Sequence, residues 1–319
     1  MRNGRNALII ALAVFVAVLL LSLITHGTGV VRNDPARNIW IPDELTMPLQ
    51  VQAAYNDQLV FFRYRWPAKQ PHLIADVLHY TGGKWERRQR TPIGSDPDGI
   101  AEDRVTMMLD DGSVPEFEHY GGYITVGANM RDFTGSGADA AHRRKYLPAT
   151  RRDPNDWYSI ADAATLDAQR RAGYFLDLWH WRAQLSNPIG RADDQNVAWF
   201  RLYDGGATMS SSNWDTDKNQ PRWMFAPAGA GIAAMRWQDV TGPQASLKGP
   251  WYLTADTAVP FDAARQWQEG DVLPAQVLRE PGESRADIRV QGRGRWANGY
   301  WDVTLGRALD TGHPLDDKI

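Results

Sequence analysis

The sequence predicts a mainly β protein: an antiparallel β-sandwich with long loops and one or two short helices, preceded by a transmembrane helix at the N-terminus. Many short segments after residue 48 have the alternation, or the β-branched and aromatic composition, that is typical of strands. A single segment, 159–172, has the pattern of a soluble helix. Because strands do not alternate with helices along the chain, a parallel sheet is not expected.

The N-terminal segment indicates the compartment. Arg2 and Arg5 precede an apolar run over 7–24, which is about 18 residues long and near the lower limit for crossing a bilayer. The positive-inside rule keeps both arginines in the cytoplasm and directs the rest of the chain outward. Since no small-residue cleavage site follows, we expect residues 1–25 to be an uncleaved signal anchor rather than a cleaved signal peptide. The remainder is therefore expected in the periplasm, tethered to the inner membrane.

Composition sets further limits on the rest of the chain. Residues 26–45 have the glycine and proline content of a tether, and 46–319 are long enough for one large domain. The net charge of −3 provides no basic field for nucleic acid. The absence of cysteine excludes disulfides, thiolate-bound metals, iron–sulfur clusters and covalently attached c-type haem. Any haem would therefore be held non-covalently.

The first half of the domain begins with a hairpin pattern. Segments 49–53 and 59–66 have strand character, and a polar turn separates them. Another strand is expected at 104–109. The polar and glycine-rich stretches 82–98 and 110–153 are expected to be turns and long surface loops.

The second half contains the predicted helix, 159–172, which Gly173 ends. The segment 174–182 is expected to be a strand or a buried turn, and the polar residues 203–222 to form loops. Further strands are expected at 251–255, 286–292 and 300–305. The dipeptide Asn298-Gly299, directly before the last of these, is the strongest local signal of a hairpin.

Several familiar catalytic motifs are absent from the sequence. It contains no GxSxG, no Walker loop, no GxGxxG after a strand and no HExxH. The seven histidines show no i,i+4 pair that would indicate zinc. The acid pairs Asp110-Asp111 and Asp193-Asp194 are more typical of turns than of glycosidase carboxylates.

The strand 104–109 contains two adjacent methionines with different surroundings. Alternation places Met107 on a purely apolar face, which indicates a core position. It places Met108 on the same face as Arg104 and Thr106, which suits a residue that lines a cofactor pocket. The alternative, a methionine that fills a gap in a core, remains open from the residues alone.

A histidine and two arginines are further candidates. His180 lies between Trp179 and Trp181 and is therefore shielded from water. It can be a metal ligand, a hydrogen-bond donor to a porphyrin edge, or a core histidine with its own polar partner. Arg285 and Arg307 can pair with haem propionates or, equally, with neighbouring aspartates.

Seven motifs, in order, resemble the ethylbenzene dehydrogenase-related haem-binding domain. This family includes the γ subunits of periplasmic molybdenum enzymes of the dimethyl sulfoxide reductase class. The resemblance covers about 49–317. The motifs are EDRVTMM (102–108), DLWHWR (177–182), GPWY (249–252), GDVLP (270–274), SRADI (284–288), RWANGYWDV (295–303) and RALDTG (307–312).

The resemblance implies one six-coordinate b-type haem in a β-sandwich, with a strand methionine and a lysine or histidine as axial ligands. The methionine corresponds to Met108, with Met107 as its neighbour and rival. Lys248 is the lysine candidate and His180 the histidine candidate. Trp179 and Arg285 are expected in the same cofactor pocket. Relatives commonly continue through further strands, so the resemblance also implies a domain shortened here or completed by a partner.

The implied role is electron transfer rather than catalysis. A periplasmic, membrane-tethered b-type cytochrome would exchange electrons with a redox partner, either the subunits of a molybdoenzyme or another cytochrome. The alternatives are a haem-free sandwich that binds carbohydrate or another ligand, which the 14 tryptophans would suit, and a haem-free structural subunit.

Overall fold

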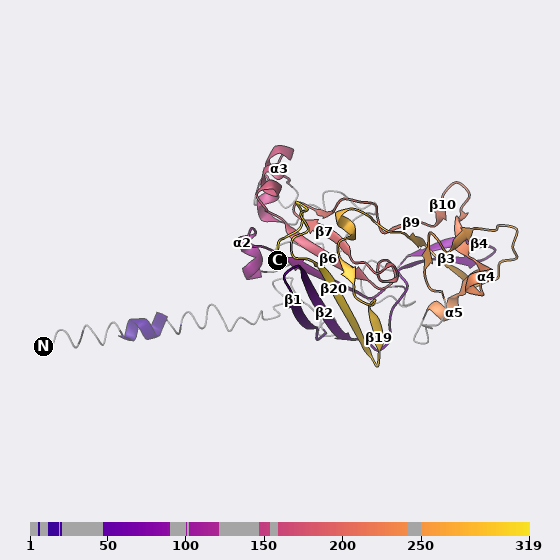
Figure 1. Ribbon diagram of the computed structural model, residues 1–319, viewed down its shortest axis with the longest axis horizontal. Helices are drawn as coiled ribbons and strands as arrows, with labels where there is room; N and C mark the ends of the chain where they lie inside the picture. Colours follow the sequence, from indigo (N-terminus) through magenta and orange to yellow (C-terminus); the bar gives the residue numbers. More distant parts are fainter. Residues whose placement is uncertain are drawn as a thin grey trace. The chain divides into compact units, whose positions relative to one another are not determined.

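The computed structural model describes residues 6, 12–18, 20, 47–89, 100, 102–120, 147–153, 159–241 and 250–319 (Figure 1). The chain divides into two compact units, Met1–Pro48 and Leu49–Ile319. In the first unit, residues 12–18 are helical. No helix within the described residues combines the length and the apolar character that crossing a bilayer requires. Most of the predicted anchor, 1–25, and the predicted tether, 26–45, lie outside the described residues.

The second unit contains a sheet with the strand order β1-β2-β20-β18, in which β19 also pairs with β20 and all pairs are antiparallel. Its strands are β1 (Gln50–Tyr55), β2 (Leu59–Pro67), β18 (Arg289–Val290), β19 (Arg295–Ala297) and β20 (Tyr300–Ala308). The predicted first hairpin is confirmed. The Asn298-Gly299 turn is confirmed too, since both residues have positive φ, 51° and 80°, as a type I′ turn requires. The strand expected at 286–292 is shorter and is confined to β18.

An opposing antiparallel sheet has the strand order β5-β6-β7-β8. Its strands are β5 (Arg104–Leu109), β6 (Leu176–Arg182), β7 (Asp193–Val197) and β8 (Arg201–Tyr203). The strand predicted at 104–109 is confirmed, and 174–182 forms a strand rather than a turn. The prediction of a turn at Asp193-Asp194 is wrong, because both residues lie buried in β7.

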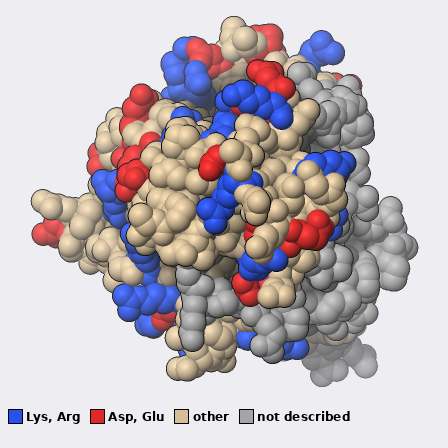
Figure 2. Space-filling model, turned by 90° about the vertical axis from the view of Figure 1, so that its right-hand side faces the viewer, with Lys and Arg blue, Asp and Glu red and all other residues tan. Residues whose placement is uncertain are grey.

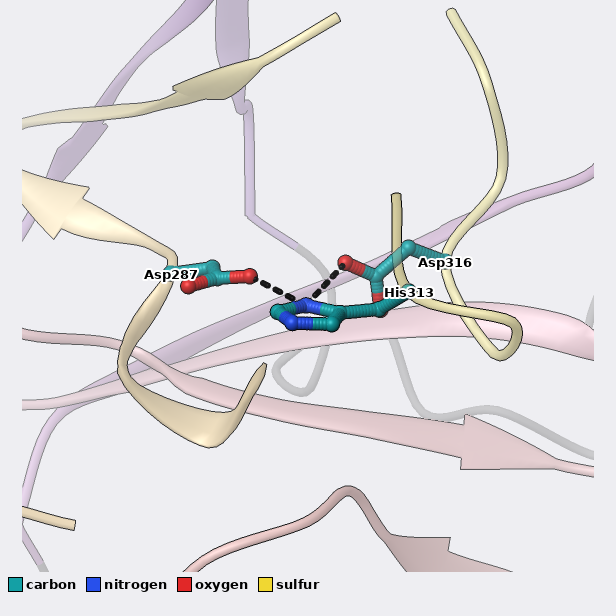
Figure 3. Close-up of side chains that lie close together, drawn as sticks. All are labelled: Asp287, His313 and Asp316. Carbon is teal, nitrogen blue, oxygen red and sulfur yellow. Dashed lines mark ion pairs between the residues drawn. The ribbon is translucent and has the colours of Figure 1, made fainter. Parts of the chain in front are cut away.

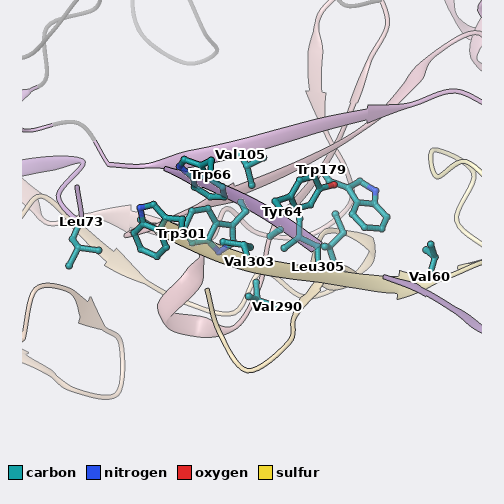
Figure 4. Close-up of a cluster of buried hydrophobic side chains, with 14 residues drawn as sticks. Val60, Tyr64, Trp66, Leu73, Val105, Trp179, Val290, Trp301, Val303 and Leu305 are labelled. Atoms are coloured by element: carbon teal, nitrogen blue, oxygen red, sulfur yellow. The ribbon is translucent and has the colours of Figure 1, made fainter. Parts of the chain in front are cut away.

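A core rich in tryptophan joins the two sheets (Figure 4). Trp66 and Trp301 stack at 6.1 Å between ring centroids, and Trp181 meets Trp301 edge-on at 5.2 Å. Trp179 is fully buried and meets Phe62 edge-on at 5.6 Å. Each buried aromatic ring removes a large apolar area from water, which makes this core the main source of cohesion between the sheets. The predicted mainly β fold with antiparallel sheets and few short helices is therefore confirmed.

A further group of short strands forms a separate core around Val77, Leu78, Trp85, Val272 and Leu273. Its largest sheet has the order β13-β16-β3-β4. The strands of this region are β3 (Asp76–Thr81), β4 (Lys84–Gln89), β9 (Ser210–Ser212), β10 (Trp214–Asp215), β11 (Gln220–Pro221), β12 (Trp223–Phe225), β13 (Met235–Arg236), β14 (Leu253–Thr254), β15 (Ala258–Pro260), β16 (Asp271–Pro274) and β17 (Gln276–Leu278). One pair, β14 with β17, is parallel.

Two loop predictions in this region are wrong in part. The stretch 82–98 was expected to be turns, but Gly82 and Gly83 form a tight turn and Trp85 is buried, so that 84–89 return as β4. The stretch 203–222 contains three short strands, β9, β10 and β11. In the face that Figure 2 shows, acidic and basic side chains are interspersed, in keeping with the small net charge.

The predicted helix is confirmed as α3 (Ala163–Arg171). Asp162 caps it, since its carboxylate accepts the backbone N–H of Thr165, and Gly173 follows its end with φ 83°. The other short helices are α2 (Pro115–Tyr120), α4 (Pro227–Ala230), α5 (Trp237–Val240) and the 3-10 turns η5 (Pro148–Thr150), η6 (Asn187–Ile189) and η7 (Ser284–Ala286). Of the loop expected over 110–153, the described part contains α2 and η5.

Candidate functional site

The β5–β8 sheet has an inner face that packs on the tryptophan core and an outer face that points away from it. Residues directly opposite each other on paired strands share a face. Met107 lies opposite Trp179, a core residue, whereas Met108 lies opposite Leu178. His180 lies opposite Thr106 and opposite Asp193. The register therefore places Met108 and His180 together on the outer face.

The two methionines have different neighbours. Met107 packs against the tryptophan core, where its sulfur accepts a hydrogen bond from the hydroxyl of Tyr64. Met108 packs against a small apolar cluster formed by Val114, Leu147, Leu176, Leu178 and Val197. The predicted alternation of the two side chains is confirmed. The structure thus keeps the Met108 thioether apart from the main core.

His180 belongs to a buried polar network. It is 6% exposed, and its Nδ1 lies 2.7 Å from Nη2 of Arg201. Because a guanidinium can only donate, Nδ1 accepts this hydrogen bond, and a neutral ring then carries its proton on Nε2. This arrangement favours the interpretation of His180 as a core histidine with a polar partner.

The network continues across the outer face as an unbroken series of hydrogen bonds. Arg201 donates from Nε to Gln195, and the Gln195 amide donates to Asp193. Arg285, in η7, binds the same carboxylate in a bidentate way, with Nε–Oδ1 at 2.6 Å and Nη2–Oδ2 at 3.0 Å. The Arg285 guanidinium also lies over the Tyr203 ring, 3.9 Å from its centroid. All of these groups except Tyr203 are buried.

The structure brings together some of the predicted site residues and separates others. Met108 and His180 share the outer face, and Arg285 joins their surroundings through Asp193. Met107 and Trp179 lie on the inner face. Lys248 lies outside the described residues. Sequence reasoning missed Arg201 and Gln195. The alternation of acid and amide side chains along β7 was the signal that could have found Gln195.

Both arginines that were candidates for binding propionates pair with aspartates. Arg285 pairs with Asp193, and Arg307 lies on the inner face, where it pairs with Asp177 at 2.7 Å and Asp194 at 3.3 Å. Arg307 also lies over Trp179, at 4.8 Å from its ring. The sequence left open whether these arginines pair with propionates or with aspartates, and in the structure both pair with aspartates.

A histidine near the C-terminus fixes the last residues to η7. His313 Nδ1 lies 2.7 Å from Asp287 and 3.8 Å from Asp316 (Figure 3). Burial raises the pKa of Asp287, although the nearby imidazole opposes the shift. Asp287 directly follows η7 and belongs to the same motif as Arg285, so this contact holds the C-terminal segment beside η7.

Fold and site together define a mainly β domain in which a thioether, an apolar patch and a buried network of histidine, arginine and aspartate share one face of a sheet. The chain belongs to the ethylbenzene dehydrogenase family, whose sequence model matches residues 24–319. The resemblance inferred from the motifs is thereby confirmed. The family is associated with haem-containing subunits of molybdenum oxidoreductases. No curated protein matches the chain significantly.

Proposed function

We propose that this protein is an electron-transfer subunit that binds one b-type haem non-covalently, with Met108 as an axial ligand. The observation that carries the proposal is the position of the Met108 thioether, on the outer face and apart from the tryptophan core. Family membership supports the same assignment. The absence of cysteine restricts the attachment to non-covalent binding.

The residues around Met108 fit the chemistry of a haem. Leu176, Leu178 and Val197 supply apolar contacts of the kind that a porphyrin ring requires. The polar network nearby contains the guanidinium groups of Arg201 and Arg285 and the carboxylate of Asp193. Two cations beside one anion favour carboxylates, and propionates are the carboxylates of a haem.

For the second axial ligand we propose Lys248 rather than His180. Axial ligands approach iron from opposite sides of the porphyrin, whereas Met108 and His180 extend from the same face of one sheet. The Nδ1 lone pair of His180 is also engaged by Arg201, so that Nε2 would have to lose its proton before it could bind iron. Lys248 is supported by the resemblance of the sequence around it.

When bound, such a haem supplies a reversible one-electron centre. With two protein ligands the iron has no open coordination position, so the role is electron transfer and not catalysis. A thioether ligand favours the reduced iron, and apolar neighbours favour it further by excluding water. The residues of the outer face would hold and orient the group, and a redox partner, a molybdoenzyme or another cytochrome, would exchange electrons with it.

We further propose that residues 1–25 tether this domain to the inner membrane, on the periplasmic side. The arginines at positions 2 and 5, followed by the apolar run, support this orientation. The family match begins at residue 24, so the apolar run precedes the family domain. Sequencing the N-terminus of the native membrane protein tests the tether, because a chain that starts near His26 would mean that the segment is cleaved.

The tryptophans give little support to a carbohydrate-binding module. Such a module needs exposed aromatic platforms, but Trp66, Trp179, Trp181 and Trp301 are buried in the sandwich core and Trp85 in the second core. Ultraviolet–visible spectra of the purified protein, oxidised and reduced, separate the two functions directly. A purified protein without a Soret band after expression with haem supplied would contradict haem binding.

The ligand assignment is tested by a matched pair of substitutions in β5. Met108→Leu preserves side-chain volume and removes the sulfur, so the reduced spectrum should change from low spin towards high spin. Met107→Leu, on the inner face, should leave the spectrum unchanged. Lys248→Met should resemble Met108→Leu, whereas His180→Gln should keep the low-spin spectrum. A spectrum that responds to Met107→Leu instead would mean that the assignment of the two methionines is wrong.

A further inference from the structure

A second buried polar cluster lies on the inner face of the β5–β8 sheet and has a large excess of negative charge. At its centre is Arg307, which is 2% exposed and pairs with Asp177, Asp194 and Asp316. The buried residues Asp204 and Asp317 complete the cluster, and Asp317 accepts from Arg307 through its backbone carbonyl at 2.9 Å. The cluster thus contains five aspartates, and three of them place a carboxylate against the single guanidinium.

Three of these carboxylates are arranged in the same way, with one oxygen bound and one free. Asp194 receives Arg307 on Oδ2 at 3.3 Å, and Asp316 receives the Thr311 hydroxyl on Oδ2 at 2.6 Å. Asp204 receives the Asn196 amide on Oδ1 at 2.8 Å. The other oxygens, Asp194 Oδ1, Asp204 Oδ2 and Asp316 Oδ1, are buried and have no hydrogen-bond partner. Ligand oxygens of the three residues lie within 4.8 Å of one another.

A neutral side chain supplies an independent observation. Asn196 is 1% exposed, and its Nδ2 donates to Asp204 while its Oδ1 is buried without a partner. Both ends of an amide share one carbon, so this oxygen lies beside the same carboxylate. A buried carbonyl oxygen without a partner is destabilising unless a donor or a cation satisfies it. Four unsatisfied oxygens in one place therefore point to a ligand.

We propose that Asp194, Asp204, Asp316 and the amide oxygen of Asn196 bind a divalent cation, Ca²⁺. The donors are all oxygens, the ligands that hard cations take, and they come without thiolate or imidazole. Oxygens on opposite sides of Ca²⁺ at roughly 2.3–2.6 Å lie about 5 Å apart, so the observed spacing fits within one coordination shell. Waters would complete the coordination. The site is independent of the proposed haem site, because it lies on the opposite face of the sheet.

The cation would have a structural role. Its ligands come from β7, from the residue after β8 and from the segment that follows β20, so one ion would join the C-terminal segment to the β5–β8 sheet. The cation would also offset the negative charge of the aspartates that the single guanidinium of Arg307 does not balance.

Calorimetric titration of the full chain, stripped with EGTA, measures the binding directly. With CaCl₂ at pH 7 we expect a saturable site, a higher melting temperature and a weaker response to MgCl₂. Asp204→Asn should lower the Ca²⁺ affinity by at least roughly tenfold. Asp217→Asn makes the same chemical change at an exposed position in the turn after β10 and should leave the affinity unchanged.

A second measurement needs the unaltered protein alone. Its melting temperature after EGTA treatment should rise as CaCl₂ is added, because a ligand that binds the folded chain stabilises it by mass action. The absence of Ca²⁺ binding would overturn the proposal, and so would binding that is the same in Asp204→Asn as in the unaltered chain. Should Asp204→Asn fail to fold, a melting temperature of the unaltered chain that does not respond to CaCl₂ would overturn it.

Discussion

The adjacent residues Asp193 and Asp194 lie on opposite faces of the β5–β8 sheet and differ in how their carboxylates are hydrogen-bonded. On the outer face, Asp193 receives both ends of one guanidinium and the amide of Gln195, so its oxygens are satisfied. On the inner face, Asp194 shares Arg307 with other aspartates and keeps one oxygen without a partner. Both carboxylates are buried. The Asp193 carboxylate is therefore satisfied by protein groups alone, whereas the inner cluster keeps carboxylate oxygens that no protein donor satisfies.

The difference shows how one strand can build two chemical environments. Successive side chains of a strand point to opposite faces, so each residue contributes to only one of them. Met107 and Met108 are separated in the same way on β5. A substitution in β5 or β7 should therefore affect the cofactor pocket or the inner cluster, but not both.

The largest effect is expected on the inner face. Arg307→Met removes the guanidinium and leaves its three carboxylate partners, Asp177, Asp194 and Asp316, without it, which should lower the free energy of unfolding by roughly 3–5 kcal/mol. Denaturation with urea, in the presence of EGTA, measures the change. A variant as stable as the unaltered chain would mean that the aspartates are already neutralised by other means.

A smaller effect is expected on the outer face. Arg285→Met removes both hydrogen bonds to Asp193, but Gln195 still donates to this carboxylate, so the cost should be about 2–3 kcal/mol. The same denaturation experiment allows a direct comparison with Arg307→Met. If the order of the two effects were reversed, the outer network would be the more strained of the two.

The pH dependence should separate the faces further. Burial raises the pKa of Asp177 to about 6, of Asp317 to about 7 and of Asp204 to about 8. A carboxyl whose pKa is higher in the folded than in the unfolded chain favours folding at low pH, and this contribution is lost as the pH rises through the folded value. In EGTA, the melting temperature should therefore fall between about pH 4 and pH 8. Asp204→Asn should reduce the slope, and a flat profile would show that these carboxyls titrate normally.

The smallest effect is expected at the surface. Arg63 pairs with Asp302 across β2 and β20, with side chains that are 49% and 38% exposed. Water already solvates both charges, so Arg63→Ala should leave the melting temperature nearly unchanged. This variant is the control for the two buried arginines, and a loss comparable to theirs would mean that the assay responds to charge in general.

The fold was largely predictable from local patterns, while the polar networks were not. Alternation in 104–109 and the Asn298-Gly299 turn were sufficient because strand faces and type I′ turns depend on neighbouring residues. The pair Asp193-Asp194 has the local character of a turn, and partners about a hundred residues away, Arg285 and Arg307, make it a buried strand. Local propensity depends on neighbouring residues in the sequence, so it cannot account for partners so far along the chain.

The candidate site shows the same division. Met108 could be selected from its strand, but Arg201 and Gln195 became visible once β6, β7 and β8 were paired. Trp179 was expected in the cofactor pocket because it precedes His180 in the sequence, but it lies on the inner face of the sheet, opposite Met107. For Trp66, Trp179, Trp181 and Trp301, burial favours core over platform, and burial is information that composition does not contain.

The pairing of β2 with β20 has a consequence for the order in which the domain can form. Residues 59–67 find their central neighbour at 300–308, close to the end of the chain. During synthesis, β2 has no second partner until the residues of β20 have been made, and closing so long a loop is slow. Until then this sheet is limited to the hairpin of β1 and β2, so the sandwich core cannot close before β20 arrives.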